Sequence, residues 1–124
     1  MRIVHISNTD SGGALELHQA LVKAGINSVM FIKHEDSGTA PETYKIPKIN
    51  VITSEIGRRI SELFLGRRNR DLGMYTYPLI GSFISRKSII RKSDIIYLHF
   101  VAQGNFLSIS EIKKILSLGK TTFF

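Results

Sequence analysis

The chain contains no cysteine, and this absence excludes a disulfide framework and any thiolate site. It also has no stretch near the ~20 consecutive apolar residues that a membrane-spanning helix requires. Residues 1–4 run directly into a strand-like segment, without the charged and apolar regions of a secretory signal. No two histidines stand at metal-ligand spacing, carboxylates do not cluster, and no serine lies in a G-x-S-x-G context. We therefore expect a cytoplasmic protein that needs neither a metal ion nor a cofactor.

The composition is that of one ordinary globular domain. At 124 residues, with 43% hydrophobic and 22% charged residues, the chain is long enough to bury a core without staples. The formal net charge of +7 is uneven, because the basic residues gather after residue 57. A basic excess indicates an anionic partner, which would be a phosphate-bearing ligand, an acidic membrane surface or nucleic acid. A merely solvated surface explains the charge equally well.

The first 33 residues predict a βαβ unit. Residues 2–7 are short, β-branched and apolar, as in a buried parallel strand, and residues 8–13 are turn-forming. Helical spacing begins at Ala14 and stops at Gly25, and residues 28–33 form a second apolar run. The two strands should be parallel, with a right-handed crossover.

The middle of the chain is less regular. We predict a loop over 34–48, a short strand over 49–53, a helix over 54–65, a loop over 66–77 and a short helix around 85–91. Ser54 stands near the N-cap of the longer helix, whose apolar positions have helical spacing. That helix either packs on the core or lies on a membrane, with its apolar stripe in the interface. In the second case the flanking arginines would meet anionic lipid: Arg58, Arg59, Arg67 and Arg68.

Regular structure returns at the end of the chain. We predict a buried strand over 94–100, a loop over 101–107, a helix opened by a Ser108-x-x-Glu111 capping box, and a strand from Thr121. The alternation of strands and helices predicts an α/β fold, a Rossmann-like, doubly wound, mostly parallel sheet in a single domain over residues 1–124. Because the chain ends within an apolar strand, we expect it to be a truncated domain.

This topology predicts the position of a binding site. Ligands of such sheets bind beyond the carboxyl ends of the strands, where the strand order reverses. Here the order should reverse between strands 2–7 and 94–100, so that loops 8–13 and 101–107 face one crevice.

Both loops carry candidate ligand-binding residues. Asp10, Ser11, Gly12 and Gly13 lead into a helix, so that backbone N–H groups and the helix N-terminus favour an anion, although the motif is neither G-x-G-x-x-G nor a Walker A loop. At the second loop we single out groups suited to a hydroxyl-rich ligand: His99, Gln103 and Asn105. Plain turn chemistry remains an alternative for both loops.

The other three histidines are expected to have structural or surface positions. His5 lies inside a predicted strand and should be a core or crevice-wall residue, whereas His18 and His34 should lie on the surface. Nucleic acid is not expected as a partner, because aromatic residues do not interleave with the basic ones.

Two stretches together resemble the family 4 (group 1) glycosyltransferases. Residues 3–14 resemble the family's I-x-H-I-S-x-x-D-S-G-G-A opening, and residues 17–25 its L-x-x-A-L-x-x-A-G helix. Residues 93–108 resemble the family's A-D-I-I-H-L-H-W-V-x-x-G-F-L-S segment, with Tyr97 where a histidine is common and Phe100 in place of the usual tryptophan. The glycine run is also shorter than in most members of the family.

The resemblance implies the N-terminal half of a GT-B fold, in which two Rossmann-like domains enclose a reaction cleft. It places Gly12 and Gly13 near the phosphates of a nucleotide-sugar donor, which the C-terminal domain mainly binds. It places the remaining site residues on the acceptor side: Asp10, Ser11, His99, Gln103 and Asn105. The E-x7-E carboxylates and the T-x-H histidine of such enzymes would lie beyond Phe124, so no catalytic residue is expected in this chain.

On this resemblance we expect an acceptor-binding domain of a retaining, metal-independent glycosyltransferase, inactive alone. The acceptor would be a polysaccharide or a lipid-linked glycan, and the protein would lie in the cytoplasm or peripherally at the inner membrane face. Two alternatives stay open. The chain is instead a non-catalytic binding module or one subunit of a split glycosyltransferase, or it is a basic nucleotide- or nucleic-acid-binding domain.

Overall fold

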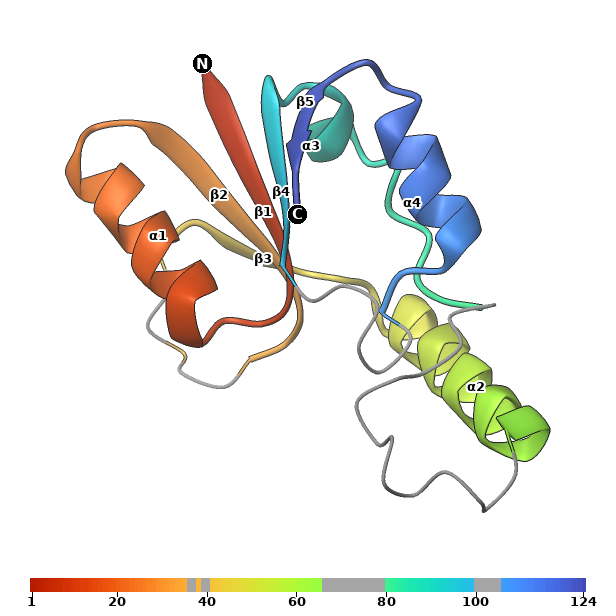
Figure 1. Ribbon diagram of the computed structural model, residues 1–124. Coiled ribbons are helices and arrows are strands. Elements are labelled where there is room, and N and C mark those ends of the chain that lie inside the picture. The colour runs from red at the N-terminus through yellow and green to blue at the C-terminus, as the bar shows by residue number, and fades with distance from the viewer. Residues whose placement is uncertain (36–37, 39–40, 66–79, 100–105) are drawn as a thin grey trace.

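A computed structural model describes residues 1–35, 38, 41–65, 80–99 and 106–124. Five parallel strands form one sheet in the order β3-β2-β1-β4-β5 (Figure 1). The strands are β1 (Arg2–Thr9), β2 (Asn27–His34), β3 (Thr43–Lys45), β4 (Ile95–His99) and β5 (Thr121–Phe123). The helices are α1 (Gly12–Lys23), α2 (Lys48–Leu65), α3 (Ser88–Arg91) and α4 (Ile109–Leu116). An α/β fold with a Rossmann-like parallel sheet is thus confirmed.

The predicted βαβ unit is present as β1, α1 and β2. β1 and β2 run parallel from Arg2 opposite Asn27 to Thr9 opposite His34. Between them, Gly25 ends α1 with a φ of +74°, in the left-handed region that glycine adopts without a steric penalty. The connection from β1 through α1 to β2 lies on one face of the sheet.

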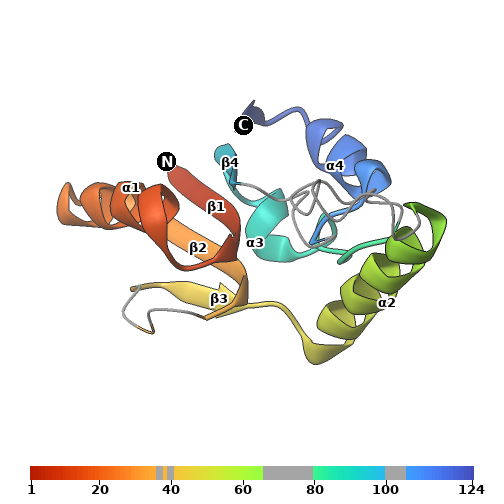
Figure 2. The same ribbon diagram turned by 60° about the horizontal axis from the view of Figure 1, so that its bottom comes forward.

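Helices cover both faces of the sheet, and the two faces differ in chemistry. Val4 and Ile6 of β1 point into the main core, which α3 and α4 close through Ile90 and Ile115. The opposite face is covered by α1, where Ala14 belongs to a much smaller apolar cluster. Figure 2 shows α1 on one side of the strands and α3 and α4 on the other. Other side chains on the α1 face of the sheet are polar, and several of them belong to the candidate site.

Two predicted elements between β2 and the second half of the chain were wrong. Residues 49–53 are not a strand, because α2 begins at Lys48, where the carbonyl oxygen of Pro47 accepts from the backbone N–H of Asn50. Ser54 therefore lies inside the helix, and its hydroxyl donates to the Val51 carbonyl oxygen rather than capping it. The predicted loop 34–48 contains the short strand β3, which pairs with β2.

Glycine is required where α2 meets the segment before α3. A Cβ atom built on Gly57 would lie 2.2 Å from the carbonyl oxygen of Ile80, far inside van der Waals contact. On the same side of α2, the amide of Asn50 donates to the Phe83 carbonyl oxygen, and the Ser82 hydroxyl donates to the Asn50 carbonyl oxygen. Small and polar groups therefore hold α2 against residues 80–83.

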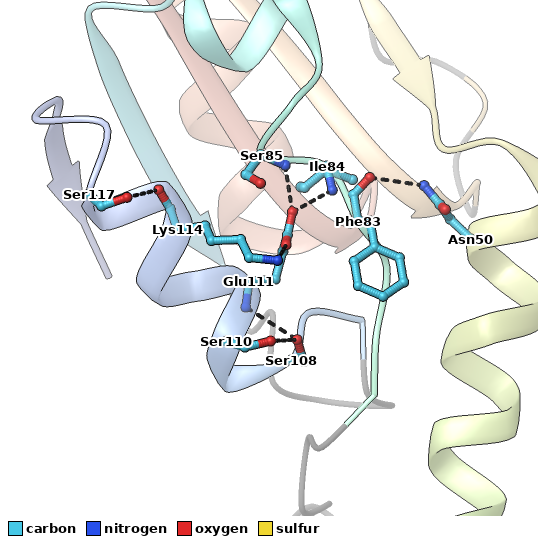
Figure 3. Close-up of polar contacts among 9 residues, drawn as sticks. All are labelled: Asn50, Phe83, Ile84, Ser85, Ser108, Ser110, Glu111, Lys114 and Ser117. Carbon is cyan, nitrogen blue, oxygen red and sulfur yellow. Dashed lines mark hydrogen bonds and ion pairs between the residues drawn. The ribbon is translucent and has the colours of Figure 1, made fainter.

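The predicted capping box at α4 is present only in half. The Ser108 hydroxyl accepts from the backbone N–H of Glu111 at 3.2 Å, as an N-cap should. The Glu111 carboxylate, however, turns to another segment and accepts from the backbone N–H groups of Ile84 at 2.7 Å and Ser85 at 2.6 Å (Figure 3). A buried carboxylate thus joins α4 to the chain that enters α3, whose helix is shorter than the predicted 85–91.

Candidate functional site

The strand order reverses between β1 and β4, as expected. β1 pairs with β2 on one side and with β4 on the other, and Ser7 lies opposite His99 near the carboxyl ends of both strands. The chain leaves β1 toward α1 on one face, while β4 is followed by α4 on the other face (Figure 1). In doubly wound sheets this is the crevice in which ligands bind.

The glycine loop enters α1 at this crevice. Gly12 has a φ of +62°, and both Gly12 and Gly13 are exposed. A Cβ built on either glycine meets no atom within 4 Å, so a ligand has room to approach the backbone there. The Ser11 side chain does not cap α1, and its hydroxyl instead lies 2.7 Å from the Thr9 hydroxyl. The Ser11 side chain therefore leaves the first N–H groups of α1 uncapped, and such a helix terminus favours an anion.

Asp10 is part of the frame of this loop. Its side chain is buried, and a carboxylate oxygen accepts from the backbone N–H of Gly38 at 3.1 Å. Gly38 lies in the connection between β2 and β3, so the bond ties two loops of the crevice end together. We expected Asp10 to line the acceptor side of the crevice. In the structure its buried carboxylate holds the glycine loop through the bond to Gly38.

Four rings from three neighbouring strands line the α1 face of the sheet beside the crevice. His5 lies opposite Tyr97, and Tyr97 lies opposite Phe123. Their ring planes are nearly parallel, with centroids 5.1 Å and 4.9 Å apart. His99 continues the row, stacked on His5 with centroids 5.3 Å apart.

The two histidines of this row are hydrogen-bonded to each other. The Nδ1 atom of His5 lies 3.0 Å from the Nε2 atom of His99. His5 is fully buried, as expected for a core or crevice-wall residue, and its Nε2 atom has no partner. His99 is half-buried at the carboxyl end of β4.

Burial keeps both imidazoles neutral near neutral pH. Desolvation, together with the electrostatic effects of His99 and His18, lowers the pKa of His5 from 6.5 to about 4. Desolvation also lowers the pKa of His99. The partly exposed His99 is therefore a neutral hydrogen-bonding group rather than a cation.

His18 was expected on the surface, and this prediction was wrong. The side chain is fully buried between α1 and the sheet, and its ring lies against that of His5 with centroids 5.6 Å apart. Its Nε2 atom is 2.6 Å from the Pro41 carbonyl oxygen, which only accepts, so this nitrogen carries the proton. Its Nδ1 atom lies 2.9 Å from the Ser28 hydroxyl. Two polar partners that are distant in sequence make the burial of this histidine possible, whereas His34 is exposed as expected.

The remaining predicted site residues, Gln103 and Asn105, lie outside the described residues. Sequence reasoning missed the bond between His5 and His99. Because side chains alternate along a strand, His5 and Ser7 share one face, as do Tyr97 and His99. What the sequence does not contain is the register that sets His5 beside His99.

Within the described part of the chain, no three side chains of the metal-ligating types are grouped to hold a metal ion. His5, His18 and His99 cluster, but four of their six ring nitrogens are directed to one another, to Ser28 and to Pro41.

No protein-family model matches this chain, and no curated protein or solved structure matches it either. What can be said of its function rests on the geometry of the crevice and on the motifs that form it.

Proposed function

We propose that this chain is the acceptor-side domain of a retaining GT-B-fold glycosyltransferase, which works with a donor-binding domain to transfer sugar from a nucleotide-sugar to a polysaccharide or lipid-linked acceptor. The observation that carries the proposal is the meeting of two motifs at one crevice. The glycine loop after β1 and His99 at the end of β4 stem from stretches far apart in sequence, and the parallel pairing of Ser7 with His99 brings them to the same end of the sheet.

The two motifs have complementary chemistry. Gly12 and Gly13 leave open space at a helix N-terminus, which suits the phosphates of a diphosphate-linked sugar. His99 lies on the neighbouring strand as a neutral imidazole, which suits a sugar hydroxyl. The resemblance assigns the glycine loop to the phosphates of the donor. Because the other domain would bind the donor mainly, we propose that on this chain the diphosphate of a lipid-linked acceptor sugar occupies the loop while its hydroxyls meet His99.

Gly13 provides the sharpest test of this assignment. Gly13→Ala adds a methyl group that meets no protein atom, and alanine favours a helix over glycine by up to about 1 kcal/mol, so the fold should keep or slightly gain stability. The same methyl group stands where a phosphate would approach the backbone. We expect an isoprenoid-diphosphate-linked sugar to bind Gly13→Ala about tenfold more weakly than wild type, a loss of about 1.4 kcal/mol.

The measurement is calorimetric titration of both proteins, with amide NMR to locate the ligand. Wild-type shifts should move at Gly12, Gly13 and His99. Equal affinity of the two proteins, or shifts confined to other parts of the sheet, would overturn the assignment of this crevice.

A lipid-linked acceptor lies in a membrane, and α2 has the surface to meet one. We expected its apolar side chains either on the core or in a membrane interface. Among the described side chains of α2, Val51 packs against the main core, whereas others face outward. Four apolar side chains on the outer side of α2 are 49–82% exposed: Ile49, Ile52, Ile56 and Leu63. They follow one another at helical spacing along one stripe. The inner side carries the small and polar residues Asn50, Ser54 and Gly57 beside Val51.

Basic residues accompany this apolar stripe. Lys48 stands four residues before Ile52, and the exposed Arg59 stands between Ile56 and Leu63 on the same side. Three further arginines follow within five residues of the end of α2 in sequence: Arg67, Arg68 and Arg70. Insertion of the stripe would contribute on the order of 1 kcal/mol for each apolar side chain, and anionic lipid about as much for each basic one. We therefore propose that α2 lies in the interface of an anionic membrane.

Figure 1 places α2 beyond the carboxyl ends of the strands, at the same end of the sheet as the glycine loop. A membrane bound along α2 would thus lie near the crevice. No helix in the described part of the chain has both the length and the apolarity to cross a bilayer.

Because the chain lacks tryptophan, a single introduced tryptophan reports on this contact without background. Ile52→Trp should show a blue-shifted emission with anionic vesicles, and quenching by brominated lipid tails. Ala20→Trp, exposed on α1, is the matched control and should show neither. If Ile52→Trp behaves like Ala20→Trp at low and at high salt, the membrane proposal fails.

A further inference from the structure

His5 is a buried polar residue that the proposed function leaves without a role. It has two ring nitrogens, and the structure gives a partner to only one of them. Nδ1 is bonded to Nε2 of His99, whereas Nε2 is buried without a partner. A buried polar atom without a hydrogen-bond partner costs free energy, and a residue held in such a position points to a functional constraint.

The surroundings of His5 hold its ring in one place. Tyr97 stacks on it at an interplanar angle of 8°, and His18 packs against it at 64°. His18 is itself fixed through both of its ring nitrogens, by Ser28 and by Pro41. The ring of His5 therefore has little freedom to turn, and its Nδ1 atom stays directed at His99.

This bond has two consequences for His99. First, its Nε2 atom is occupied, so Nδ1 is the only ring nitrogen left for a ligand. Second, one proton lies between the two rings, and the buried Nε2 atom of His5 decides where it sits. A buried N–H without an acceptor is less favourable than a buried lone pair, so His5 carries its proton on Nδ1 and donates to Nε2 of His99, which leaves the proton of His99 on Nδ1. If His99 became a cation, its Nε2–H would have to donate to His5, which would force His5 to carry its own proton on the buried, partnerless Nε2 atom.

We infer that His5 is a positioning residue that locks the orientation and the tautomer of His99 and keeps it uncharged, so that the Nδ1 atom of His99 meets a sugar hydroxyl rather than a phosphate. The chemistry nearby agrees with this division. No cationic side chain of the described residues takes part in the ring cluster that contains His99. A phosphate would then bind at the first N–H groups of α1, at Gly12 and Gly13, and a sugar hydroxyl would bind at His99. The assignment of the hydroxyl to His99 rests on the proposed function, whereas the lock itself does not.

The groups that face His5 come from two elements. His18 approaches from α1, and Tyr97 and His99 approach from β4. The lowered pKa of both His5 and His99 agrees with a pair that resists protonation.

Nitrogen-15 NMR of the imidazole rings tests the lock directly, because the chain has only four histidines. In the wild type, His99 should show one dominant tautomer with Nε2 hydrogen-bonded, and its pKa should lie below that of a solvent-exposed histidine because the ring is partly buried. His5→Phe keeps a ring on Tyr97 and removes the bond, so His99 should average between tautomers and its pKa should rise toward the ordinary value. His5→Asn places an amide near the position of Nδ1 and should restore the locked signal.

Tyr97→Phe is the matched control, since it keeps the stacked ring and the bond between the histidines. It should leave the His99 signals unchanged. Two equally populated tautomers of His99 in the wild type would overturn the lock even if His5→Phe failed to fold. So would a His5→Phe spectrum in which His99 is unaltered.

A second titration separates the lock from the proposed function. A methyl glycoside should shift the His99 ring signals, and inorganic phosphate at equal ionic strength should not. If the lock is present but phosphate shifts His99 and the glycoside does not, the hydroxyl assignment fails while the positioning role of His5 stands.

Discussion

Glu111 should be among the most stabilising polar side chains of the chain. Its carboxylate is almost fully buried, and one oxygen accepts two short bonds, from Ile84 N–H and Ser85 N–H. Its other oxygen has no hydrogen-bond partner, and Lys114 Nζ, 3.5 Å away and half-exposed, adds only an ion pair (Figure 3). Most of the stabilisation must therefore come from the two backbone bonds rather than from the lysine.

Glu111→Ala removes both bonds and leaves two buried N–H groups without acceptors. Hydrogen bonds to charged groups contribute roughly 1.5–3 kcal/mol each, so we expect a loss of about 3–5 kcal/mol in the free energy of unfolding. Glu111→Gln keeps an acceptor oxygen and should cost about 1–2 kcal/mol. In urea, the midpoint of Glu111→Ala should fall by roughly 2 M.

Control variants and the pH dependence show whether the stabilisation by Glu111 comes from the two backbone bonds or from the ion pair with Lys114. Lys114→Ala should cost less than about 1 kcal/mol, because the lysine is exposed. Burial alone would raise the pKa of Glu111, but the hydrogen bonds from Ser85 and Ile84 and the charge of Lys114 lower it below 4.5. The stability that the carboxylate contributes is therefore complete above pH 4.5 and is lost as the pH falls through the lowered pKa. The advantage of wild type over Glu111→Gln should vanish in that acidic range. Equal losses for Lys114→Ala and Glu111→Ala would refute this account.

Two further predictions concern packing and pH. Gly57→Ala should destabilise the fold by about 1–3 kcal/mol in thermal or urea unfolding, because its methyl group meets backbone at Ile80; a neutral or stabilising effect would mean that α2 does not lie against residues 80–83. The stability of the wild type should fall between pH 6.5 and pH 4 by on the order of 2–3 kcal/mol through His5, since the unfolded chain binds a proton there that the folded one does not; the slope should be smaller in His5→Asn, and an identical slope would contradict the burial of a neutral His5.

Much of the fold could be predicted from local patterns. The strands predicted at 2–7, 28–33 and 94–100 are apolar runs bounded by turns, and α1 could be predicted from its helical spacing and terminal glycine. The reversal of strand order between β1 and β4 followed from the doubly wound pattern. These features depend on residues that are close together in sequence.

The errors share one physical cause, since each depended on contacts between distant residues. Residues 49–53 are β-branched and apolar and suit a strand or a helix, and only the docking of Asn50 and Gly57 on residues 80–83 decides for a helix. The sequence pattern places His18 on the surface, because it does not show that Ser28 and Pro41 provide hydrogen-bond partners for a buried ring. Ser108 caps α4 as predicted, but the Glu111 carboxylate accepts from the backbone N–H groups of Ser85 and Ile84, which lie 26 and 27 residues away in sequence.

The candidate site follows the same division. The glycine loop and His99 could be named from their motifs, and the topology brought them to one end of the sheet. The buried position of Asp10 and the pairing of His5 with His99 could not be predicted, because both depend on the exact strand register and loop path.

The central claim is that the crevice serves the acceptor rather than the donor. The direct measurement is a calorimetric comparison, on the chain as it is, of an isoprenoid-diphosphate-linked sugar with a nucleotide-diphosphate sugar. The account predicts at least a tenfold preference for the isoprenoid-linked ligand, with only weak binding of the nucleotide-sugar. Tight binding of the nucleotide-sugar, with the isoprenoid-linked ligand bound more weakly or not at all, would contradict it.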